Sequence, residues 1–332
     1  MIDTHEDYSV TFTGRERADL VAVERDSTPL TPTEVAGRTL VSLISAGTEL
    51  AGYRGLLDMP HPGYAAVFEV EGVGRDVDDV RVGERAFCMG PHRSSQRVRR
   101  DEMLPLPPGL ASEEAVFARL MGVTMSTLTT TAARPPAQVL VTGLGLVGHL
   151  AARIFALCGY DVIGCDPLEG RRALLTQAGL KRVVAAPPLD DPRVAGHVAL
   201  VVECSGHEQA ALDGCAVVRK RGEVVLVGVP WAPRTELSAH DLLHAVFHNY
   251  VVLRSGWEWE LPRRPTDNGD ASIFGNLTAA LRWLAEGRIA VDDLYTTVSP
   301  QEAQRAYQDL LHNRIARLGL VFDWADSEFA MG

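Results

Sequence analysis

A glycine-rich turn between an apolar strand and a helix carries the clearest chemical signal in the sequence. Gly143, Gly145 and Gly148 have the G-x-G-x-x-G spacing. They lie between a predicted strand at 138–142 and a predicted helix at 149–157, which is the context that the dinucleotide-binding fingerprint requires. The first glycine permits a tight turn, the second lets the backbone approach a pyrophosphate, and the third lets helix and strand pack closely. The predicted cofactor contacts in this turn also include Leu144, Leu146 and Val147.

An acidic residue at the end of the next predicted strand indicates which dinucleotide this turn would bind. Asp166 follows the strand at 161–165, at about the 20-residue distance typical of the fingerprint. A carboxylate there can accept hydrogen bonds from both ribose hydroxyls and would repel a 2′-phosphate, so the sequence favours NAD over NADP. Arg171, which we count among the cofactor contacts, and Arg172 weaken this preference, because an arginine can neutralise such a phosphate. The alternative is a glycine-rich turn that binds no nucleotide.

Two later strand ends provide further candidate contacts. Cys204 and Ser205 end one apolar segment, and Gly228 ends the next. In an open parallel sheet, ligands bind beyond the carboxyl ends of the strands, so these residues are predicted to contact the cofactor. Ordinary strand-to-helix turns explain them equally well.

The elements around these residues predict two domains of an α/β protein. From Tyr8 to about Val98 the chain reads as short β segments broken by glycine and proline. From 138 onward, strands alternate with helices and the strands are continuously apolar, which indicates a doubly wound parallel sheet covered on both faces. We expect a β-rich domain formed by 1–121 and 266–332, and a Rossmann domain formed by 122–265.

Composition and charge exclude several classes of partner. The chain of 332 residues has a formal net charge of −11, which argues against binding to nucleic acid or to an anionic membrane surface. The five cysteines include no C-x-x-C pair, so they are expected to be buried thiols in a reducing compartment. The polar N-terminus and the lack of an apolar segment of about 18 residues predict a cytoplasmic protein.

Motifs in the first half resemble those of the medium-chain dehydrogenase/reductase superfamily, in the same order. These motifs are Ser45-Ala-Gly-Thr-Glu-Leu50, Tyr53-Arg54-Gly55, Pro62-Gly63-Tyr64-Ala65 and Val82-Gly83-Glu84-Arg85. Their wording is closest to the branch that includes bacteriochlorophyllide (2-desacetyl-2-hydroxyethyl) dehydrogenases and similar alcohol dehydrogenases. The resemblance implies a GroES-like β-rich catalytic domain, an NAD-binding Rossmann domain, and a homodimer that pairs the edge strands of its Rossmann domains.

The zinc ligands that the resemblance would imply are missing. Ala46 stands in place of the first cysteine ligand, and Tyr64-Ala65 in place of the next His-Glu pair. The stretch 120–127, where the later ligand would lie, holds neither cysteine nor acid, and Cys88 has no companions for a structural zinc. Because tetrahedral zinc needs at least three protein ligands, we expect no catalytic metal.

Hydride transfer without zinc still needs a group that gives and takes a proton. His92 is the natural candidate by its unperturbed pKa, although it could instead lie in a surface loop. Tyr64 replaces a ligand and could donate a proton, or it could simply fill the vacated space. Thr48 stands where the superfamily places a relay hydroxyl.

Other residues near these motifs have two interpretations each. Glu49, which we include in the catalytic set, and Arg54, a candidate substrate contact, could form an ion pair that orders their loop. Trp257 could line a substrate pocket or a dimer contact. Three histidines lie on one face of a predicted helix: His240, His244 and His248. They could be metal ligands, or they could form a solvated or interface surface.

Together these features predict reversible hydride transfer between NAD(H) and a secondary alcohol or its ketone. The polar candidate residues favour a hydroxyl-rich small molecule, such as a polyol, a sugar, a cyclitol or a specialised metabolite. One alternative is an NADPH-dependent enoyl or quinone reductase of the same superfamily. A second alternative is a non-catalytic NAD-binding protein.

Overall fold

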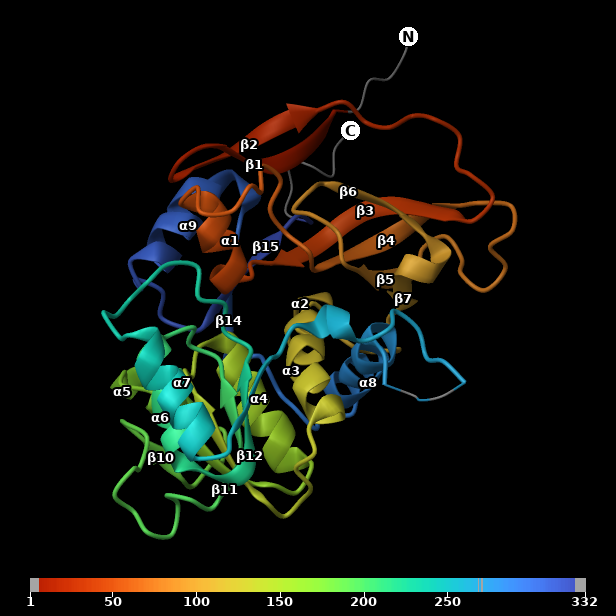
Figure 1. Ribbon diagram of the computed structural model, residues 1–332. Coiled ribbons are helices and arrows are strands. Elements are labelled where there is room, and N and C mark those ends of the chain that lie inside the picture. Colours follow the sequence, from red (N-terminus) through yellow and green to blue (C-terminus); the bar gives the residue numbers. More distant parts are fainter. Residues whose placement is uncertain (1–5, 268, 270, 326–332) are drawn as a thin grey trace. The chain divides into compact units, whose positions relative to one another are not determined.

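The computed structural model describes residues 6–267, 269 and 271–325, which fold as two compact units (Figure 1). One unit is discontinuous and consists of Met1–Arg119 with Leu281–Gly332, and the other is Leu120–Ala280. The unit boundaries fall within two helices, α3 (Ala118–Thr130) and α8 (Ile273–Ala285). The first unit is rich in β-strands and the second has a parallel sheet between helices, which confirms the predicted α/β class.

The β-rich unit has a seven-stranded sheet in its described residues, ordered β14-β15-β3-β4-β5-β7, with β6 paired to β3. Most neighbours are antiparallel, whereas β14 and β15 are parallel. Along β3, buried residues alternate with partly exposed ones, as expected for a strand with one face on the core. The strands of this sheet are β3 (Glu34–Leu43), β4 (Ala66–Val73), β5 (Arg85–Cys88), β6 (Ser95–Arg99), β7 (Met103–Pro105), β14 (Tyr295–Val298) and β15 (Gly319–Asp323).

A hairpin and three helices complete the β-rich unit. The hairpin strands are β1 (Asp7–Gly14) and β2 (Arg17–Val23), and the helices are α1 (Ala46–Tyr53), α2 (Ser112–Ala115) and α9 (Ala303–Leu311). Aromatic rings join the hairpin to α1 and α9, because the Phe12 ring centroid lies 5.5 Å from that of Tyr53 and 4.9 Å from that of Tyr307. The core of this unit therefore ties its N-terminal strands to a helix near the end of the chain.

The second unit is built around a six-stranded parallel sheet with the order β10-β9-β8-β11-β12-β13. From β8 the chain runs outward in one direction, and from β11 in the other. Ligands of doubly wound proteins bind beside such a reversal, at the carboxyl ends of the strands. The strands are β8 (Gln138–Thr142), β9 (Asp161–Cys165), β10 (Val183–Val184), β11 (Val198–Glu203), β12 (Val218–Leu226) and β13 (Val252–Ser255).

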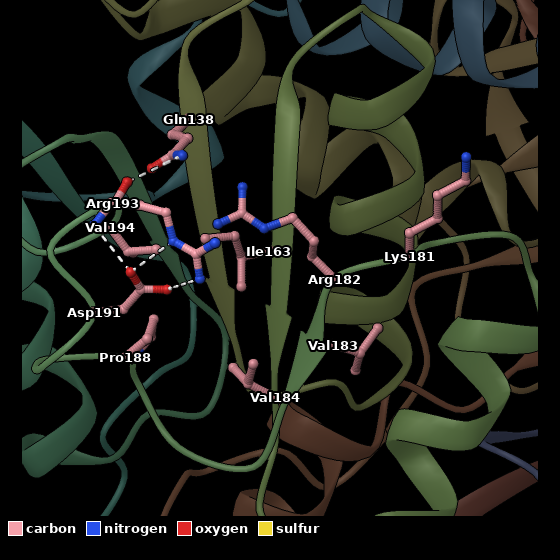
Figure 2. Close-up of a pocket in the computed structure, with 10 residues that line it drawn as sticks. All are labelled: Gln138, Ile163, Lys181, Arg182, Val183, Val184, Pro188, Asp191, Arg193 and Val194. Atoms are coloured by element: carbon pink, nitrogen blue, oxygen red, sulfur yellow. Dashed lines mark hydrogen bonds and ion pairs between the residues drawn. The ribbon is translucent and has the colours of Figure 1, made fainter.

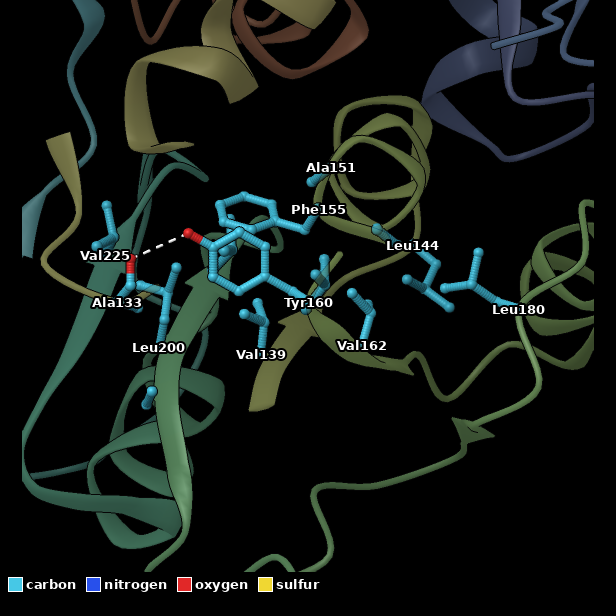
Figure 3. Close-up of a cluster of buried hydrophobic side chains, with 14 of the residues drawn as sticks. Ala133, Val139, Leu144, Ala151, Phe155, Tyr160, Val162, Leu180, Leu200 and Val225 are labelled. Atoms are coloured by element: carbon cyan, nitrogen blue, oxygen red, sulfur yellow. Dashed lines mark hydrogen bonds between the residues drawn. The ribbon is translucent and has the colours of Figure 1, made fainter. Parts of the chain in front are cut away.

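Helices cover both faces of the parallel sheet. One face packs against α4 (Leu146–Leu157) and α5 (Glu169–Gln177), and the other against α6 (Glu208–Val217) and α7 (Ala239–His248). Figure 3 shows the first of these cores, where Phe155 packs beside Tyr160, whose hydroxyl donates a hydrogen bond of 3.0 Å to the Ala133 carbonyl. Burial on both faces explains why the central strands read as continuous apolar segments.

Short 3₁₀ turns occur at Arg100–Glu102, Glu258–Glu260 and Pro300–Glu302. Within the described part of the chain, every helix is too short or too polar to cross a lipid bilayer.

Candidate functional site

Two of the three motif glycines are required by the fold itself. Gly143 has a φ of +80°, and a Cβ atom there would lie 2.7 Å from the backbone nitrogen of Ser205. A Cβ atom on Gly148 would lie only 1.8 Å from the carbonyl oxygen of Gly143. A side chain at either position would therefore push apart strand β8, helix α4 and the turn after β11.

Gly145 differs, because the unliganded fold does not require a glycine at this position. A Cβ atom there would meet nothing nearer than the Arg171 Nη1 atom, 3.9 Å away, and its φ of −64° is accessible to any residue. Gly145 is the N-cap of α4, so the N–H groups of the first helical turn, in Leu146 and Val147, have no acceptor within the helix. Open space beside free N–H groups at a helix N-terminus suits the approach of a phosphate.

Asp166 lies directly beside this turn and is buried, with 2% of its surface exposed. Its Oδ2 atom accepts a hydrogen bond of 2.7 Å from the N–H of Leu144, and its Oδ1 atom accepts one of 2.8 Å from the N–H of Leu168. The Arg171 Nη1 atom lies 3.4 Å from Oδ2. The structure thus brings the predicted acid, the predicted arginine and the glycine turn together.

A second buried acid, Glu203, lies at the carboxyl end of β11 and was not identified from the sequence. Its carboxylate accepts hydrogen bonds from the N–H groups of Ser205, at 2.7 Å, and Gly206, at 3.0 Å, and from the Ser205 hydroxyl. Burial raises the pKa of Glu203, and these hydrogen bonds partly oppose the rise. The only sequence signal was an acid that ends an apolar strand.

The turn that Glu203 holds contains the other predicted cofactor contacts of this unit. It includes Cys204 and Ser205, and Ser205 lies against Gly143. A Cβ atom on Gly228 would lie 2.3 Å from the nitrogen of Gly206, so the ends of β11 and β12 also approach closely. The predicted residues at three strand ends therefore surround one edge of the sheet.

In the β-rich unit, Tyr64 is the centre of a polar cluster. Its hydroxyl donates a hydrogen bond to the Ser45 hydroxyl, and the Arg119 guanidinium lies 4.9 Å from the centroid of its ring. Burial raises the pKa of Tyr64 above its ordinary value, and the negative charge of Glu49 raises it further. The hydroxyls of Ser45 and Thr48 and the charge of Arg119 oppose this rise.

Glu49 lies in α1 and is completely buried, so hydrogen bonds inside the unit must satisfy its charge. Its Oε1 atom accepts a hydrogen bond of 2.7 Å from the N–H of Ser45. Its Oε2 atom accepts one of 2.5 Å from the Tyr307 hydroxyl and lies 3.0 Å from the His92 Nε2 atom. The expected ion pair between Glu49 and Arg54 is wrong, because Glu49 faces these partners while Arg54 is exposed at the end of α1.

His92 is buried with no exposed surface, so the surface-loop interpretation is wrong. Its Nδ1 atom lies 2.7 Å from the Ser42 Oγ atom, which also accepts a hydrogen bond of 2.9 Å from the Trp324 indole. With both ring nitrogens engaged, by Ser42 and Glu49, the imidazole has no nitrogen left for direct contact with a substrate. Any contribution of His92 to chemistry must pass through its neighbours.

Two predicted features lie on the exposed surface of the second unit. Trp257 follows β13 at the edge of the parallel sheet and is 66% exposed. The three histidines of α7 lie on one exposed face, as predicted, with ring centroids 5.8 Å apart for His240 and His244 and 4.2 Å apart for His244 and His248.

The donor atoms present do not fit a zinc ion. Ala46 and Ala65 offer no ligand atom, and Tyr64 is engaged with Ser45. Among the residues that the structure describes, no group of three histidine, cysteine, aspartate or glutamate side chains is arranged to hold a metal.

A cavity of about 610 Å³ lies elsewhere in the second unit, near the amino ends of β8 and β10 (Figure 2). Gln138 and Val183, the first residues of those strands, line it, whereas Gly143 follows the opposite end of β8. Its arginines are paired, Arg193 with Asp191 and Arg182 with Asp161. The residues that line this cavity include none of the glycine turn, 143–148.

The contrast between Gly145 and Gly148 generates a paired prediction. We expect Gly148→Ala to lower the free energy of unfolding by about 1–3 kcal/mol, because the new methyl group overlaps the Gly143 carbonyl. We expect Gly145→Ala to unfold like the wild type but to bind NADH roughly tenfold more weakly, because the methyl group occupies the phosphate approach. Chemical denaturation and calorimetric titration measure the two effects. Unchanged NADH affinity in Gly145→Ala would contradict this assignment.

Comparison with known proteins finds similarity to dehydrogenases over part of the sequence. Residues 147–257 match the family model described as zinc-binding dehydrogenase. The alcohol dehydrogenase of Geobacillus stearothermophilus is 27% identical over 208 residues, which are 51% of this chain and 61% of that protein. The match therefore spans less than two thirds of that relative's length.

Solved structures share the fold over nearly the whole chain. Galactitol-1-phosphate dehydrogenase from Escherichia coli has a TM-score of 0.80 at 16% identity, and covers 95% of this chain and 99% of its own. Acetophenone reductase from Geotrichum candidum, in complex with NAD, has a TM-score of 0.78 at 16% identity, with coverages of 97% and 99%. A zinc-binding dehydrogenase of Sinorhizobium meliloti bound to NADP has a TM-score of 0.75 at 18% identity, with coverages of 96% and 99%.

The likeness to the bacteriochlorophyllide branch stays a prediction. Residues 147–257 are similar in sequence to the zinc-binding dehydrogenase family, and the solved structures share the fold.

Proposed function

We propose that this protein is a zinc-independent dehydrogenase that transfers hydride reversibly between NAD(H) and a secondary alcohol or its ketone. The observation that carries the proposal is the glycine turn, where Gly145 borders open space beside the buried carboxylate of Asp166. Ala46 and Ala65, which offer no zinc-ligand atoms, support a reaction that proceeds without a metal ion.

The names of the similar proteins support the substrate class. They describe an alcohol dehydrogenase, a dehydrogenase of a sugar-alcohol phosphate and a reductase of an aromatic ketone. In each case the named substrate carries a hydroxyl or carbonyl group at the reacting carbon. We extend this class to the present chain and favour a polyol, sugar or cyclitol, with Arg54 and Trp257 as candidate substrate contacts.

Tyr64 is the proposed proton donor and acceptor of the reaction. A bound nicotinamide would supply or accept the hydride. During reduction, the Tyr64 hydroxyl gives its proton to the carbonyl oxygen, and during oxidation the phenolate takes the proton of the alcohol. The Ser45 hydroxyl, which accepts the Tyr64 hydrogen bond, and the Thr48 hydroxyl provide a route by which the proton is returned.

His92 and Glu49 have a different role in this proposal. Both are fully buried and bonded to each other, and Glu49 also binds the N–H of Ser45. They are positioning residues, because they fix the segment that presents Ser45 and Thr48 beside Tyr64.

A substrate panel read at the NADH absorbance tests the proposed activity. We expect the wild-type protein to oxidise secondary alcohols or polyols and to reduce ketones. Tyr64→Phe should lower kcat by about 10²–10⁴-fold, because the proton donor is lost, while NADH affinity stays unchanged. Reduction of enones or quinones without any alcohol or ketone turnover would instead support the enoyl reductase alternative. One zinc ion per chain in metal analysis of the purified protein would overturn the metal-free mechanism.

The raised pKa of Tyr64 makes a further prediction about pH. A proton donor works only while it holds its proton, so a raised pKa extends its working range upward. We expect the rate of ketone reduction to stay flat through neutral pH and to fall only above pH 10, beyond the ordinary tyrosine value. A pH–rate profile of kcat measures this. A fall centred near pH 6.5 would point to a histidine as the donor and would refute the assignment.

A second copy of this chain is the partner that we propose. Strand β13 lies at the open edge of the parallel sheet, and Val252 on it is 46% exposed. Nearby Phe247 and Tyr250 are 77% and 64% exposed. An uncovered strand edge beside exposed aromatic rings favours pairing with an identical edge.

Sedimentation velocity tests this pairing. We expect the wild-type protein to have twice the mass of one chain, and Val252→Lys combined with Phe247→Asp to have the mass of one. Leu157→Lys on α4, which changes another exposed apolar residue, is the control and should stay paired. A monomeric wild type, or a double variant that still pairs, would exclude this edge.

A further inference from the structure

Two opposite charges act on the side chain of Tyr64. Glu49, on α1, is completely buried, and its negative charge raises the pKa of Tyr64. Arg119, on α3, lowers that pKa, and its Cζ atom lies 4.9 Å from the centroid of the Tyr64 ring. The charge of Arg119 therefore favours the phenolate form of Tyr64, whereas the charge of Glu49 favours the neutral phenol.

The other groups that act on Tyr64 are hydroxyls. Those of Ser45 and Thr48 interact with the Tyr64 hydroxyl, and the Tyr307 hydroxyl, on α9, is coupled to Tyr64 electrostatically. Burial raises the pKa of Tyr307 well above its ordinary value, so this hydroxyl stays neutral. Among these groups, Arg119 alone brings a positive charge.

The position of Arg119 is unfavourable for a cation. Only 4% of its surface is exposed, and the burial of a charge costs free energy. Arg119 is also the second residue of α3, where the dipole of the first helical turn disfavours positive charge. Proteins retain such local costs mainly at sites that need them, and the contact with Tyr64 gives this cation a use.

We propose that Arg119 is a positioning residue that holds the Tyr64 ring and supplies the positive charge under which Tyr64 acts as the base in alcohol oxidation. In that step the hydride of the alcohol carbon goes to the bound NAD, and the hydroxyl proton goes to the Tyr64 phenolate. The guanidinium stabilises the phenolate by charge before the transfer, and contacts the face of the neutral ring after it. This inference rests on the proposed function, because it assumes that Tyr64 is the base.

Arg85, on β5 of the same unit, provides a matched control. Its Nη1 atom donates a hydrogen bond of 3.0 Å to the hydroxyl of Ser112, on α2. Removal of Arg85 takes the same charge from the unit, but Arg85 is not among the groups that shift the pKa of Tyr64.

The test follows the ionisation of residue 64 directly in the full chain. A fluorotyrosine replaces Tyr64, because fluorine lowers the pKa of the phenol towards the range in which proteins stay folded, and its fluorine NMR signal changes on ionisation. We expect Arg119→Met to raise the titration midpoint by about 1–3 pH units, the effect of losing an opposite charge at this distance. Arg119→Lys, which keeps the charge, should recover most of that shift. Arg85→Met should leave the midpoint unchanged.

Alcohol oxidation by the chain with its natural Tyr64 provides a second readout. At a fixed pH below the midpoint, Arg119→Met should lower kcat by about tenfold for each unit of that shift, because fewer molecules hold the phenolate. The KM for the alcohol should change little, because Arg119 acts on Tyr64 and not on the substrate.

The outcomes separate this inference from the proposed function. An unchanged midpoint in Arg119→Met overturns the role of Arg119, whatever the activity. A shifted midpoint in a protein that turns over no alcohol or ketone supports the effect of Arg119 on Tyr64 and overturns the proposed function instead. A higher KM at unchanged kcat also overturns the role of Arg119, because that result assigns the guanidinium to the substrate. Thermal unfolding identifies variants that fail to fold, and Arg119→Gln, which keeps a polar end, then replaces Arg119→Met.

Discussion

Hydrogen bonds from backbone N–H groups to buried carboxylates hold each loop of the candidate site in place. Glu49 binds the N–H of Ser45, Asp166 binds that of Leu144, and Glu203 binds that of Ser205. A buried charge is costly unless such donors surround it, so each acid and its loop stabilise one another. Without the acid the loop loses its anchor, and without the loop the acid loses its donors.

The same interaction divides the polar residues of the β-rich unit into two groups. His92 and Glu49 satisfy each other in the interior and are closed to solvent. Tyr64 is partly exposed, and its hydroxyl interacts with those of Ser45 and Thr48, so a ligand can still reach its ring. Under the proposed function, the histidine is therefore the support, and the tyrosine is the reactive candidate.

Local patterns predicted the parallel-sheet unit closely, since periodicity and glycine spacing determine its elements. The predicted strands at 138–142 and 161–165 match β8 and β9. Helix α4 begins at Leu146, three residues before the predicted start, because Gly145 is its N-cap and Gly148 lies in its first turn. Among the motif glycines, the sequence could not separate Gly148, which packing requires, from Gly145, which packing leaves open.

Contacts between distant residues could not be predicted from such patterns. His92 follows a Gly-Pro pair, which reads as an exposed turn, yet its partners Ser42 and Glu49 lie 50 and 43 positions earlier. The role of Glu203 could not be predicted, because a single acid at the end of an apolar strand is also typical of an exposed strand end. In both cases burial decided the role, and burial depends on which segments the fold brings together.

The buried network of the β-rich unit also sets an order of assembly. Glu49 needs the hydroxyl of Tyr307, 258 positions later, and Ser42 needs the indole of Trp324, 282 positions later. A chain emerging from the ribosome presents both acceptors long before their donors exist. The continuous unit 120–280 has all its strands by then and can fold first, whereas the discontinuous unit must wait for the last part of the chain. Truncation near the C-terminus would therefore damage the earliest-made part of the protein most.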